Sequence, residues 1–264
     1  MSELIDTHAH LEEFEELESV LANARNSALK AIIAVGSNET SNMKILEISC
    51  RYPEFVFPAL GLHPQELAYT DEKQVMHILD VIEQRIQYTV AIGEIGLDYD
   101  KRILRETGKD KQKDILQKLL LLAKRYDKPV SLHSRYAWKD CLHLVQCAGI
   151  KHAIFHWFTG SFNVLHEIIE AGYYVSCTPA AEYHEDHRRA IKNTPLEQLL
   201  LETDCPVTYG RENRFQSQPS DILRSMKAAA LLKGIPEKLI AQRTTQNAMK
   251  IFNIQIPRCS ISRV

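Results

Sequence analysis

The chain has 264 residues, of which 45% are apolar and 25% are charged, so it can bury a large core and is not disordered. Lys and Arg number 32 against 34 Asp and Glu, which excludes an overall basic field, so a polyanion would have to bind through a local patch. Six cysteines without a C-x-x-C pair exclude a disulfide-stapled mini-domain, and no apolar run approaches the ~20 residues of a membrane span. We therefore expect a cytoplasmic protein with reduced thiols and no membrane contact.

Eight short, β-rich apolar segments recur along the chain and are the candidate strands. They are LIDTHAH (4–10), AIIAVGS (31–37), FVFPALGLHP (55–64), TVAIGEIGLD (89–98), PVSLHSR (129–135), HAIFHWFTG (152–160), GYYVSCTP (172–179) and LLLETDCP (199–206). The segments are continuously apolar rather than alternating, which is typical of strands buried on both faces of a parallel sheet.

Amphipathic segments with apolar residues three and four apart separate these strands and predict crossover helices, most clearly at 71–86 and 111–128. Two further helical segments, 219–234 and 236–252, follow the last strand. Because no change in composition divides the chain, we predict one domain over 1–264, with the barrel and terminal helices over 1–253 and a C-terminal tail over 254–264. Eight strand–helix units favour a (β/α)8 TIM barrel of the metallo-dependent hydrolase type over an open sheet, which usually begins with a glycine-rich phosphate loop that this chain lacks.

The carboxyl ends of the predicted strands carry residues that bind metals or transfer protons. They are His8, His10, His63, Glu94, His133, His156 and Asp204. Because the chemistry of a parallel barrel takes place at this end, these side chains should converge. Four of these five histidines, together with Glu94 and Asp204, already exceed one tetrahedral shell, so we predict two divalent ions (Zn, Mn, Mg, Fe or Ni) that share Glu94 as a bridging ligand. Asp6 is expected on the same strand face as His8 but deeper in the barrel, where it supports a ligand rather than binding metal.

Six motifs carry a resemblance to a known family. DTHAHL, GLHP, GEIGLDY, PVSLHSR, HWFTG and LLLETDCP have the order and approximate spacing of the motifs of the TatD-related metal-dependent deoxyribonucleases, within the amidohydrolase superfamily. The resemblance extends from the first strand to QNAMKIF at 246–252. It implies a distorted (β/α)8 barrel and a hydrolase acting on ester bonds, which cleaves the phosphodiester bonds of DNA with two divalent ions and an activated water.

The resemblance also assigns roles to individual residues. One ion would be held by His8, His10, Glu94 and Asp204, and the second by Glu94, His133 and His156. Glu94 and Asp204 would be the catalytic pair, with Asp204 orienting or deprotonating the attacking water. His63 and Arg135 would bind substrate near the scissile phosphate.

Three residues depart from the family pattern. Trp157 follows His156, Cys205 follows Asp204, and Tyr136 stands where the family commonly has an aspartate. None of them removes a predicted ligand, so we expect hydrolysis to be kept and substrate preference to differ. The departures indicate a divergent branch of the family, for which we expect an archaeal source.

The residues leave two other functions open. A superfamily relative could act on a C–N or ester bond as a deaminase, lactonase or aminoacyl-tRNA deacylase, with the metals polarising a carbonyl. A barrel with structural metals, or one that binds nucleic acid without cutting it, would not be an enzyme.

The predicted loops favour DNA as the partner of the site, single-stranded or at its ends, and give no sign of an obligate protein partner. Loop cations could contact phosphates and loop aromatic residues could stack on unpaired bases. The cations are Lys101, Arg102, Arg105, Lys109, Lys111, Arg188, Arg189, Arg211 and Arg214; the aromatic residues are Tyr99, Trp157, Tyr183 and Phe215.

Overall fold

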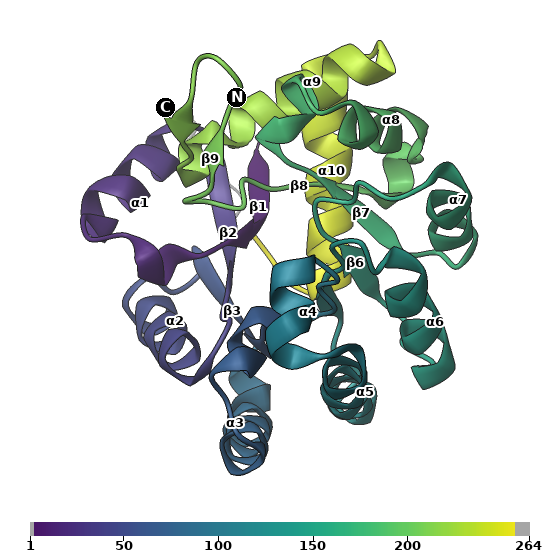
Figure 1. Cartoon of the computed structure of the whole chain (residues 1–264). Helices are drawn as coiled ribbons and strands as arrows, with labels where there is room; N and C mark the ends of the chain where they lie inside the picture. Colours follow the sequence, from purple (N-terminus) through teal and green to yellow (C-terminus); the bar gives the residue numbers. More distant parts are fainter. Residues whose placement is uncertain (1–2, 257–264) are drawn as a thin grey trace.

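The computed structural model describes residues 3–256 and contains a parallel sheet whose eight strands follow one another in chain order, β1 to β8 (Figure 1). The strands are β1 Leu4–Ala9, β2 Leu29–Val35, β3 Val56–Leu62, β4 Ala91–Gly96, β5 Val130–His133, β6 Ala153–Phe155, β7 Tyr174–Cys177 and β8 Leu199–Leu201. A short antiparallel pair, β9 Thr208–Tyr209 and β10 Phe215–Gln216, follows β8. All eight predicted strands are confirmed, and the parallel order is that of a (β/α)8 barrel.

Helices surround the strands on the outside (Figure 1). They are α1 Leu17–Asn26, α2 Glu39–Arg51, α3 Glu72–Arg85, α4 Lys101–Thr107, α5 Lys109–Arg125, α6 Trp138–Ala148, α7 Phe162–Glu170, α8 Glu185–Asn193, α9 Ile222–Lys233 and α10 Glu237–Phe252. The predicted helices at 71–86 and 111–128 are α3 and α5, and those at 219–234 and 236–252 are α9 and α10. Asn38 and Asp71 begin α2 and α3 with capping boxes, which satisfy backbone N–H groups of the first turn.

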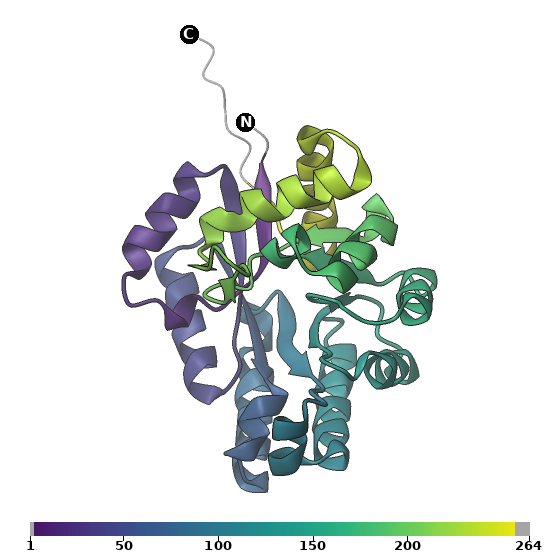
Figure 2. The same ribbon diagram turned by 45° about the horizontal axis from the view of Figure 1, so that its top comes forward.

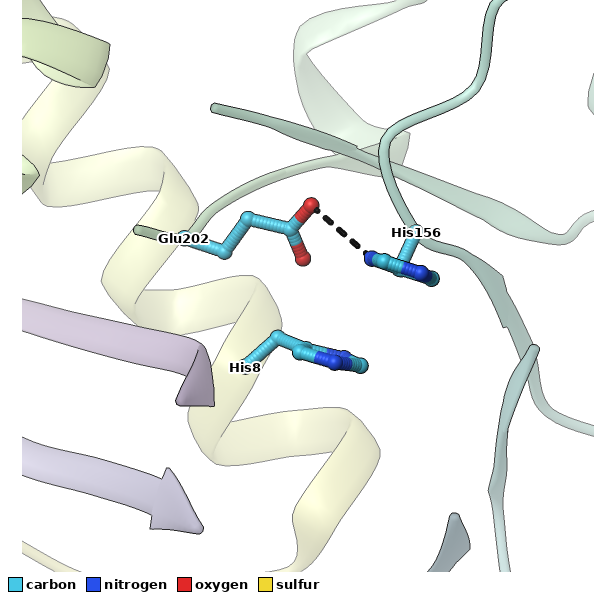
Figure 3. A group of neighbouring side chains, drawn as sticks. All are labelled: His8, His156 and Glu202. Carbon is cyan, nitrogen blue, oxygen red and sulfur yellow. Dashed lines mark ion pairs between the residues drawn. The ribbon is translucent and has the colours of Figure 1, made fainter. Parts of the chain in front are cut away.

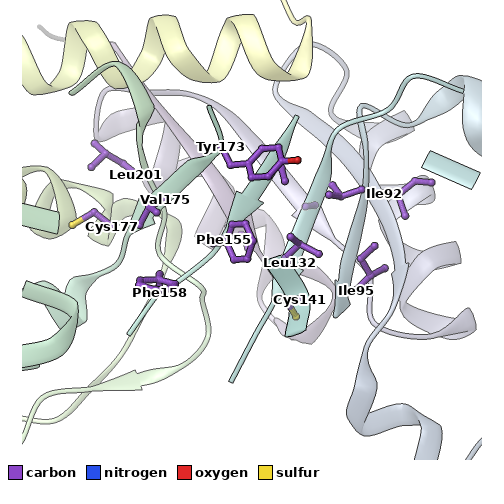
Figure 4. Packing of buried hydrophobic residues seen from close by; sticks show 14 of the residues in the cluster. Ile92, Ile95, Leu132, Cys141, Phe155, Phe158, Tyr173, Val175, Cys177 and Leu201 are labelled. Carbon is purple, nitrogen blue, oxygen red and sulfur yellow. The ribbon is translucent and has the colours of Figure 1, made fainter. Parts of the chain in front are cut away.

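Buried apolar side chains form two clusters on the two sides of the barrel wall. The outer cluster lies between strands and helices and includes Ile92, Leu132 and Phe155 (Figure 4). The inner cluster joins inward residues such as Ile5 and Ile33 to Phe252 and other residues of α10. Consecutive residues of a strand alternate between the clusters, as Leu4 and Ile5 do, which explains why the strands are apolar throughout.

The last helix brings the two ends of the chain together. Helix α10 packs against β1, β8 and α9, and Figures 1 and 2 show it behind the strands and beside α9. The hydroxyl of Thr245 in this helix donates a hydrogen bond to the carbonyl of Glu3, 242 residues away. The inner cluster continues into Ile254, so the barrel interior is filled at the end opposite the strand carboxyl termini.

The barrel is nearly closed by the segment that follows β8. Ala9 of β1 forms a parallel bridge with Cys205, His10 N donates to Cys205 O at 2.8 Å, and Asp204 N donates to His8 O at 2.9 Å. Asp6 reinforces this seam, because its carboxylate accepts hydrogen bonds from the backbone N–H of His8 and from both the N–H and the hydroxyl of Thr203. The seam therefore fixes the two segments that carry His8, His10 and Asp204.

Several predictions concern features at the margins of the fold. The tail predicted at 254–264 lies outside the described residues from position 257 onward. Five of the six cysteines lie within residues 3–256, and all five are free thiols there. Over the same range, each helix is too short or too polar to cross a bilayer.

Candidate metal centre

The predicted ligands converge at the carboxyl ends of the strands around a cavity of about 1110 Å³. His10, His63, Glu94, His133, Arg135, His156 and Asp204 all line this cavity, and His8 is fully buried beside Glu94 and Asp204. The structure thus brings together all eight residues that the sequence singled out as the site.

Two irregularities in the strands aim ligands into the barrel. Between Asp6 and Ala9, β1 advances three residues while β2 advances two, and between Ile92 and Ile95, β4 likewise gains one residue on both neighbours. Such an extra residue reverses the alternation of side chains, so that those beyond it point to the opposite face. His8 lies within the first irregularity, His10 follows it, and Glu94 lies within the second.

The irregularity in β1 corrects one prediction. Because this register shift falls between Asp6 and Ala9, the regular alternation that placed Asp6 and His8 on one strand face does not hold across this segment. Asp6 contacts the backbone of His8 and both polar groups of Thr203 rather than an imidazole ring. It supports the centre by closing the barrel seam.

The carboxylate of Glu94 divides the histidines into two sets. Its Oε2 atom lies 3.5 Å from the Nε2 atoms of both His8 and His10, and Asp204 Oδ1 lies 3.6 Å from the same two nitrogens. Its Oε1 atom lies 3.0 Å from His133 Nδ1, 3.0 Å from His156 Nε2 and 3.5 Å from His63 Nε2. One carboxylate oxygen therefore faces each set.

The donor set fits divalent cations. Two ligands of a tetrahedral ion at about 2.1 Å are separated by about 3.4 Å, which is close to the 3.5 and 3.6 Å separations around Glu94 Oε2 and too long for strong hydrogen bonds. His8 Nε2 is buried at this point and has no hydrogen-bond partner among the described residues. Five buried acids lie in or next to the site, and the buried residues of 3–256 include no lysine or arginine. The acids are Asp6, Glu94, Asp98, Glu202 and Asp204.

Each candidate histidine ligand also has an oxygen near its other ring nitrogen. His8 Nδ1 lies 3.2 Å from Ser131 Oγ, and His133 Nε2 lies 3.0 Å from Asp98 Oδ2. His156 Nδ1 lies 3.5 Å from Glu202 Oε1 (Figure 3), and His10 Nδ1 lies 3.7 Å from Glu12 Oε1. The oxygens near His8 and His133 are within hydrogen-bond distance, and an acceptor there favours the tautomer that presents a lone pair inward and raises the basicity of the ligand. The carboxylates near His156 and His10 are farther away, and their negative charge has the same effect more weakly.

Glu202 is one of three fully buried members of this supporting set, with Ser131 and Asp98. It is fully buried, its Oε1 atom accepts a hydrogen bond from Trp157 N at 2.9 Å, and His8 and His156 stack beside it with ring centroids 4.1 Å apart (Figure 3). Glu202, Asp98 and Glu12 are not among the site residues predicted from the sequence. Their spacing could have identified them, because each carboxylate lies two or four residues from a predicted ligand along the chain.

His63 differs from the other histidines of the site. Its Nδ1 atom accepts a hydrogen bond from Gln65 N at 3.1 Å, so in the neutral ring the proton is on Nε2, which points toward Glu94. Burial lowers the pKa of His63 to about 3, which keeps the ring neutral. Although His63, Glu94 and His133 lie close enough to form a metal-binding group, this tautomer makes His63 a hydrogen-bond donor into the cavity.

The two predicted catalytic carboxylates have different electrostatic surroundings. Burial disfavours the charged form of Glu94, but His63, His156, His10 and His133 outweigh it and hold its pKa well below the usual value. Burial dominates at Asp204 and raises its pKa despite the neighbouring histidines. Glu94 is therefore the more stable anion, and Asp204 is the better proton acceptor.

The structure does not gather the loop cations as the sequence suggested. Within residues 3–256, the only cationic side chains lining the cavity are Lys44 and Arg135. Arg102 pairs with Asp100, and Lys111 donates to backbone carbonyls. Of the four aromatic candidates only Trp157 lines the cavity, where Tyr136 and Trp138 also lie.

A (β/α)8 barrel with a histidine- and carboxylate-rich centre at its strand ends defines a metal-dependent hydrolase. A model of the TatD related DNase family matches residues 5–253, and the chain belongs to this family. It is 36% identical over 260 residues to human deoxyribonuclease TATDN3, with 94% of each chain covered. It is 31% identical to the uncharacterized metal-dependent hydrolase YabD of Bacillus subtilis, over 95% of this chain and 99% of the relative.

A solved structure supports the same family and the same fold. The crystal structure of YJJV, a TatD homologue from Escherichia coli K12, superposes with a TM-score of 0.85 at 28% identity and covers 96% of this chain and 98% of its own. The family resemblance inferred from the six motifs is thereby confirmed, as is the predicted barrel.

Proposed function

We propose that this protein hydrolyses phosphodiester bonds of DNA with two divalent ions and a water molecule. His8, His10, Glu94 and Asp204 would hold one ion, and Glu94, His133 and His156 the other. The observation that carries the proposal is the division of Glu94, whose two oxygens face separate sets of imidazole nitrogens. One shared carboxylate with a ligand set on each side is the arrangement expected of a two-ion hydrolytic centre.

When bound, the two ions lower the pKa of water and neutralise charge that develops on the phosphoryl oxygens. Asp204 lines the cavity, and its raised pKa suits it to accept the proton that the attacking water loses. The water oxygen forms a bond to phosphorus while the ester bond to one deoxyribose oxygen breaks. That oxygen takes up a proton and leaves as a hydroxyl group, so the products are a phosphomonoester and an alcohol.

Two further residues would orient the substrate. His63 offers its Nε2–H to a non-bridging phosphate oxygen, which is consistent with its neutral tautomer. Arg135 lines the cavity with a partly exposed guanidinium group, whose contact with Asp100 at 3.4 Å leaves other N–H groups to meet a phosphate. Because Lys44 and Arg135 are the only Lys or Arg side chains among residues 3–256 that line the cavity, we expect the protein to contact few phosphates, as it would on an unpaired strand or a strand end.

Metal analysis combined with a substrate panel tests this function. The wild-type protein and a Glu94→Ala variant are stripped of metal, reloaded with each divalent ion, and assayed on single- and double-stranded DNA, RNA and chromogenic phosphodiesters. Glu94→Ala should lower the bound-ion count and abolish turnover, whereas Glu197→Ala, at an exposed carboxylate, should behave as wild type. Full nuclease activity in metal-free Glu94→Ala would refute the mechanism.

The same panel separates the proposal from hydrolysis of a C–N or ester bond. Arg135→Ala should weaken cleavage of DNA and reduce its salt dependence, because a phosphate contact is lost. Turnover of a small neutral amide or ester would not change in this way. No turnover of any phosphodiester with any ion would favour the amide or ester substrate.

A further inference from the structure

The rim of the metal cavity carries one exposed aromatic ring. Tyr136, Trp138 and Trp157 all line the cavity, but Trp138 and Trp157 are partly buried, whereas 59% of Tyr136 is exposed. Tyr136 follows β5 by three residues, immediately after Arg135. Much of this ring is therefore apolar surface that a ligand in the cavity could contact, beside the predicted metal ligands.

The ring is exposed but firmly supported. It packs edge-on against Trp138 at 5.8 Å between centroids, and Trp138 packs against Phe158 at 6.1 Å. Phe158 and its neighbour Phe155 are fully buried in the outer cluster (Figure 4). A chain of aromatic contacts therefore joins Tyr136 to the core of the protein, so the ring is presented in a fixed orientation.

The backbone at this position is also fixed, and in an unfavourable conformation. Tyr136 has φ +56°, in the left-handed region that bulky side chains rarely adopt. Hydrogen bonds hold the turn on both sides: Ala137 N donates to Ser134 O at 3.0 Å, and Tyr99 N donates to Arg135 O at 2.8 Å. Glycine or asparagine would fit this conformation at a lower cost, so backbone preference does not explain a tyrosine here.

The surroundings identify the ligand that the ring suits. The Arg135 guanidinium carbon lies over the Tyr136 ring, 5.6 Å from its centroid, so a cation and an aromatic ring are held together at the rim. A nucleotide carries the complementary pair, a phosphate and a planar base. The face of a base can stack on a protein ring only where its neighbours in the duplex do not cover it.

We propose that Tyr136 is a stacking surface for an unpaired nucleobase next to the scissile phosphate, and that it favours single-stranded substrate. This inference rests on the proposed phosphodiesterase function and adds the part of the substrate that the rim recognises. The phosphate is engaged by Arg135 and the site beneath it, and the base by the ring of Tyr136.

The test compares two variants on two substrates. Tyr136→Asn removes the ring and suits the left-handed backbone, while Tyr136→Phe keeps the ring; Tyr69→Asn, at a tyrosine that is 84% exposed and outside the cavity lining, is the control. The substrates are a single-stranded oligonucleotide and the same oligomer with abasic tetrahydrofuran units in place of its nucleotides. The readouts are KM, kcat and the melting temperature.

Loss of one stacking contact should raise KM of Tyr136→Asn for the oligonucleotide roughly tenfold, with kcat within about twofold of wild type. KM for the base-free oligomer should not change, the melting temperature should stay level or rise because strain is relieved, and Tyr136→Phe should match wild type. An unchanged KM for the oligonucleotide would overturn the inference, as would an equal loss on both substrates together with a lower melting temperature. Failure of the wild-type protein to cleave either substrate would instead refute the phosphodiesterase function itself.

Discussion

The carboxylate of Glu202 provides a demanding test of how the metal centre is built. Glu202→Gln keeps the size of the side chain and an oxygen that can accept from Trp157 N, but it removes the negative charge beside His156 Nδ1, which lies 3.5 Å away. Replacing such a partner of a metal-binding histidine lowers metal affinity by about 10- to 100-fold. Because the substitution keeps one of the two functions of the carboxylate, we expect the lower end, about tenfold, or roughly 1.4 kcal/mol for the affected ion.

Glu202→Ala should have a larger effect for a reason visible in the structure. It also leaves the backbone N–H of Trp157 without its acceptor, in a residue with φ +40° that is flanked by the buried residues His156 and Phe158. An unsatisfied buried donor costs about 1–3 kcal/mol, so this variant should lose stability as well as metal affinity. The glutamine variant separates the two effects, because its stability should stay near that of wild type.

The measurement is a titration of metal-free protein with Zn²⁺ or Mn²⁺ against a competing chelator. Of the two proposed ions, the one beside His133 and His156 should bind more weakly, while the one beside His8 and His10 should keep its affinity, because those histidines have other oxygen neighbours, Ser131 and Glu12. Glu197→Gln on the protein surface serves as the control. The reasoning is refuted if neither ion weakens in Glu202→Gln, or if both weaken equally.

Three further outcomes are expected. Adding a divalent ion at about 100 times its dissociation constant to metal-free protein should stabilise it by about 2.7 kcal/mol, and thermal unfolding should show a rise of roughly 5–10 °C that a chelator reverses. Gly61→Ala would place a Cβ atom 2.3 Å from Glu94 O, so urea unfolding should show a loss of about 1–3 kcal/mol and a titration should show weaker metal binding. Burial lowers the pKa of His187 to about 4 in the folded protein, below the value of about 6.5 in the unfolded chain. The neutral ring therefore contributes its full free energy of stabilisation above pH 6.5, and this contribution is lost as the pH falls toward 4. Urea unfolding at pH 7.5 and pH 5 should show about 2 kcal/mol of this loss in wild type, and a His187→Gln variant that keeps the whole pH dependence would contradict the assignment.

The sequence predicted the barrel and the position of the ligands because both follow from regular features. A parallel strand that is buried on both faces must be apolar throughout, and its carboxyl end must lie beside those of its neighbours, so His10 and Asp204 could be placed together without knowing any side-chain direction. The same regularity failed for Asp6, because the extra residue in β1 leaves no mark in the amino-acid pattern.

The supporting carboxylates and the loop cations could not be predicted for a different reason. The role of Glu202 depends on the turn at Trp157, and that of Asp98 on the ring orientation of His133, both of which are set by tertiary contacts. A loop residue such as Arg102 carries the same charge whether it faces the cavity or a nearby carboxylate, so its position in the sequence does not distinguish the two cases. In this chain Arg102 binds Asp100, at 3.1 Å, and the cavity receives Arg135 instead.

The seam between β1 and the segment after β8 has a consequence for the order of folding. His8 and Asp204 are joined by a backbone hydrogen bond across nearly 200 residues, and α10 packs against β1 and β8, so these are among the most distant contacts in the chain. Contacts of such high sequence separation form slowly, and during synthesis the free edge of β1 has no barrel partner until the region around residue 204 has emerged. The ability to bind an ion at His8 and His10 should therefore appear only when the chain is almost complete, which makes metal binding a late marker of a finished fold.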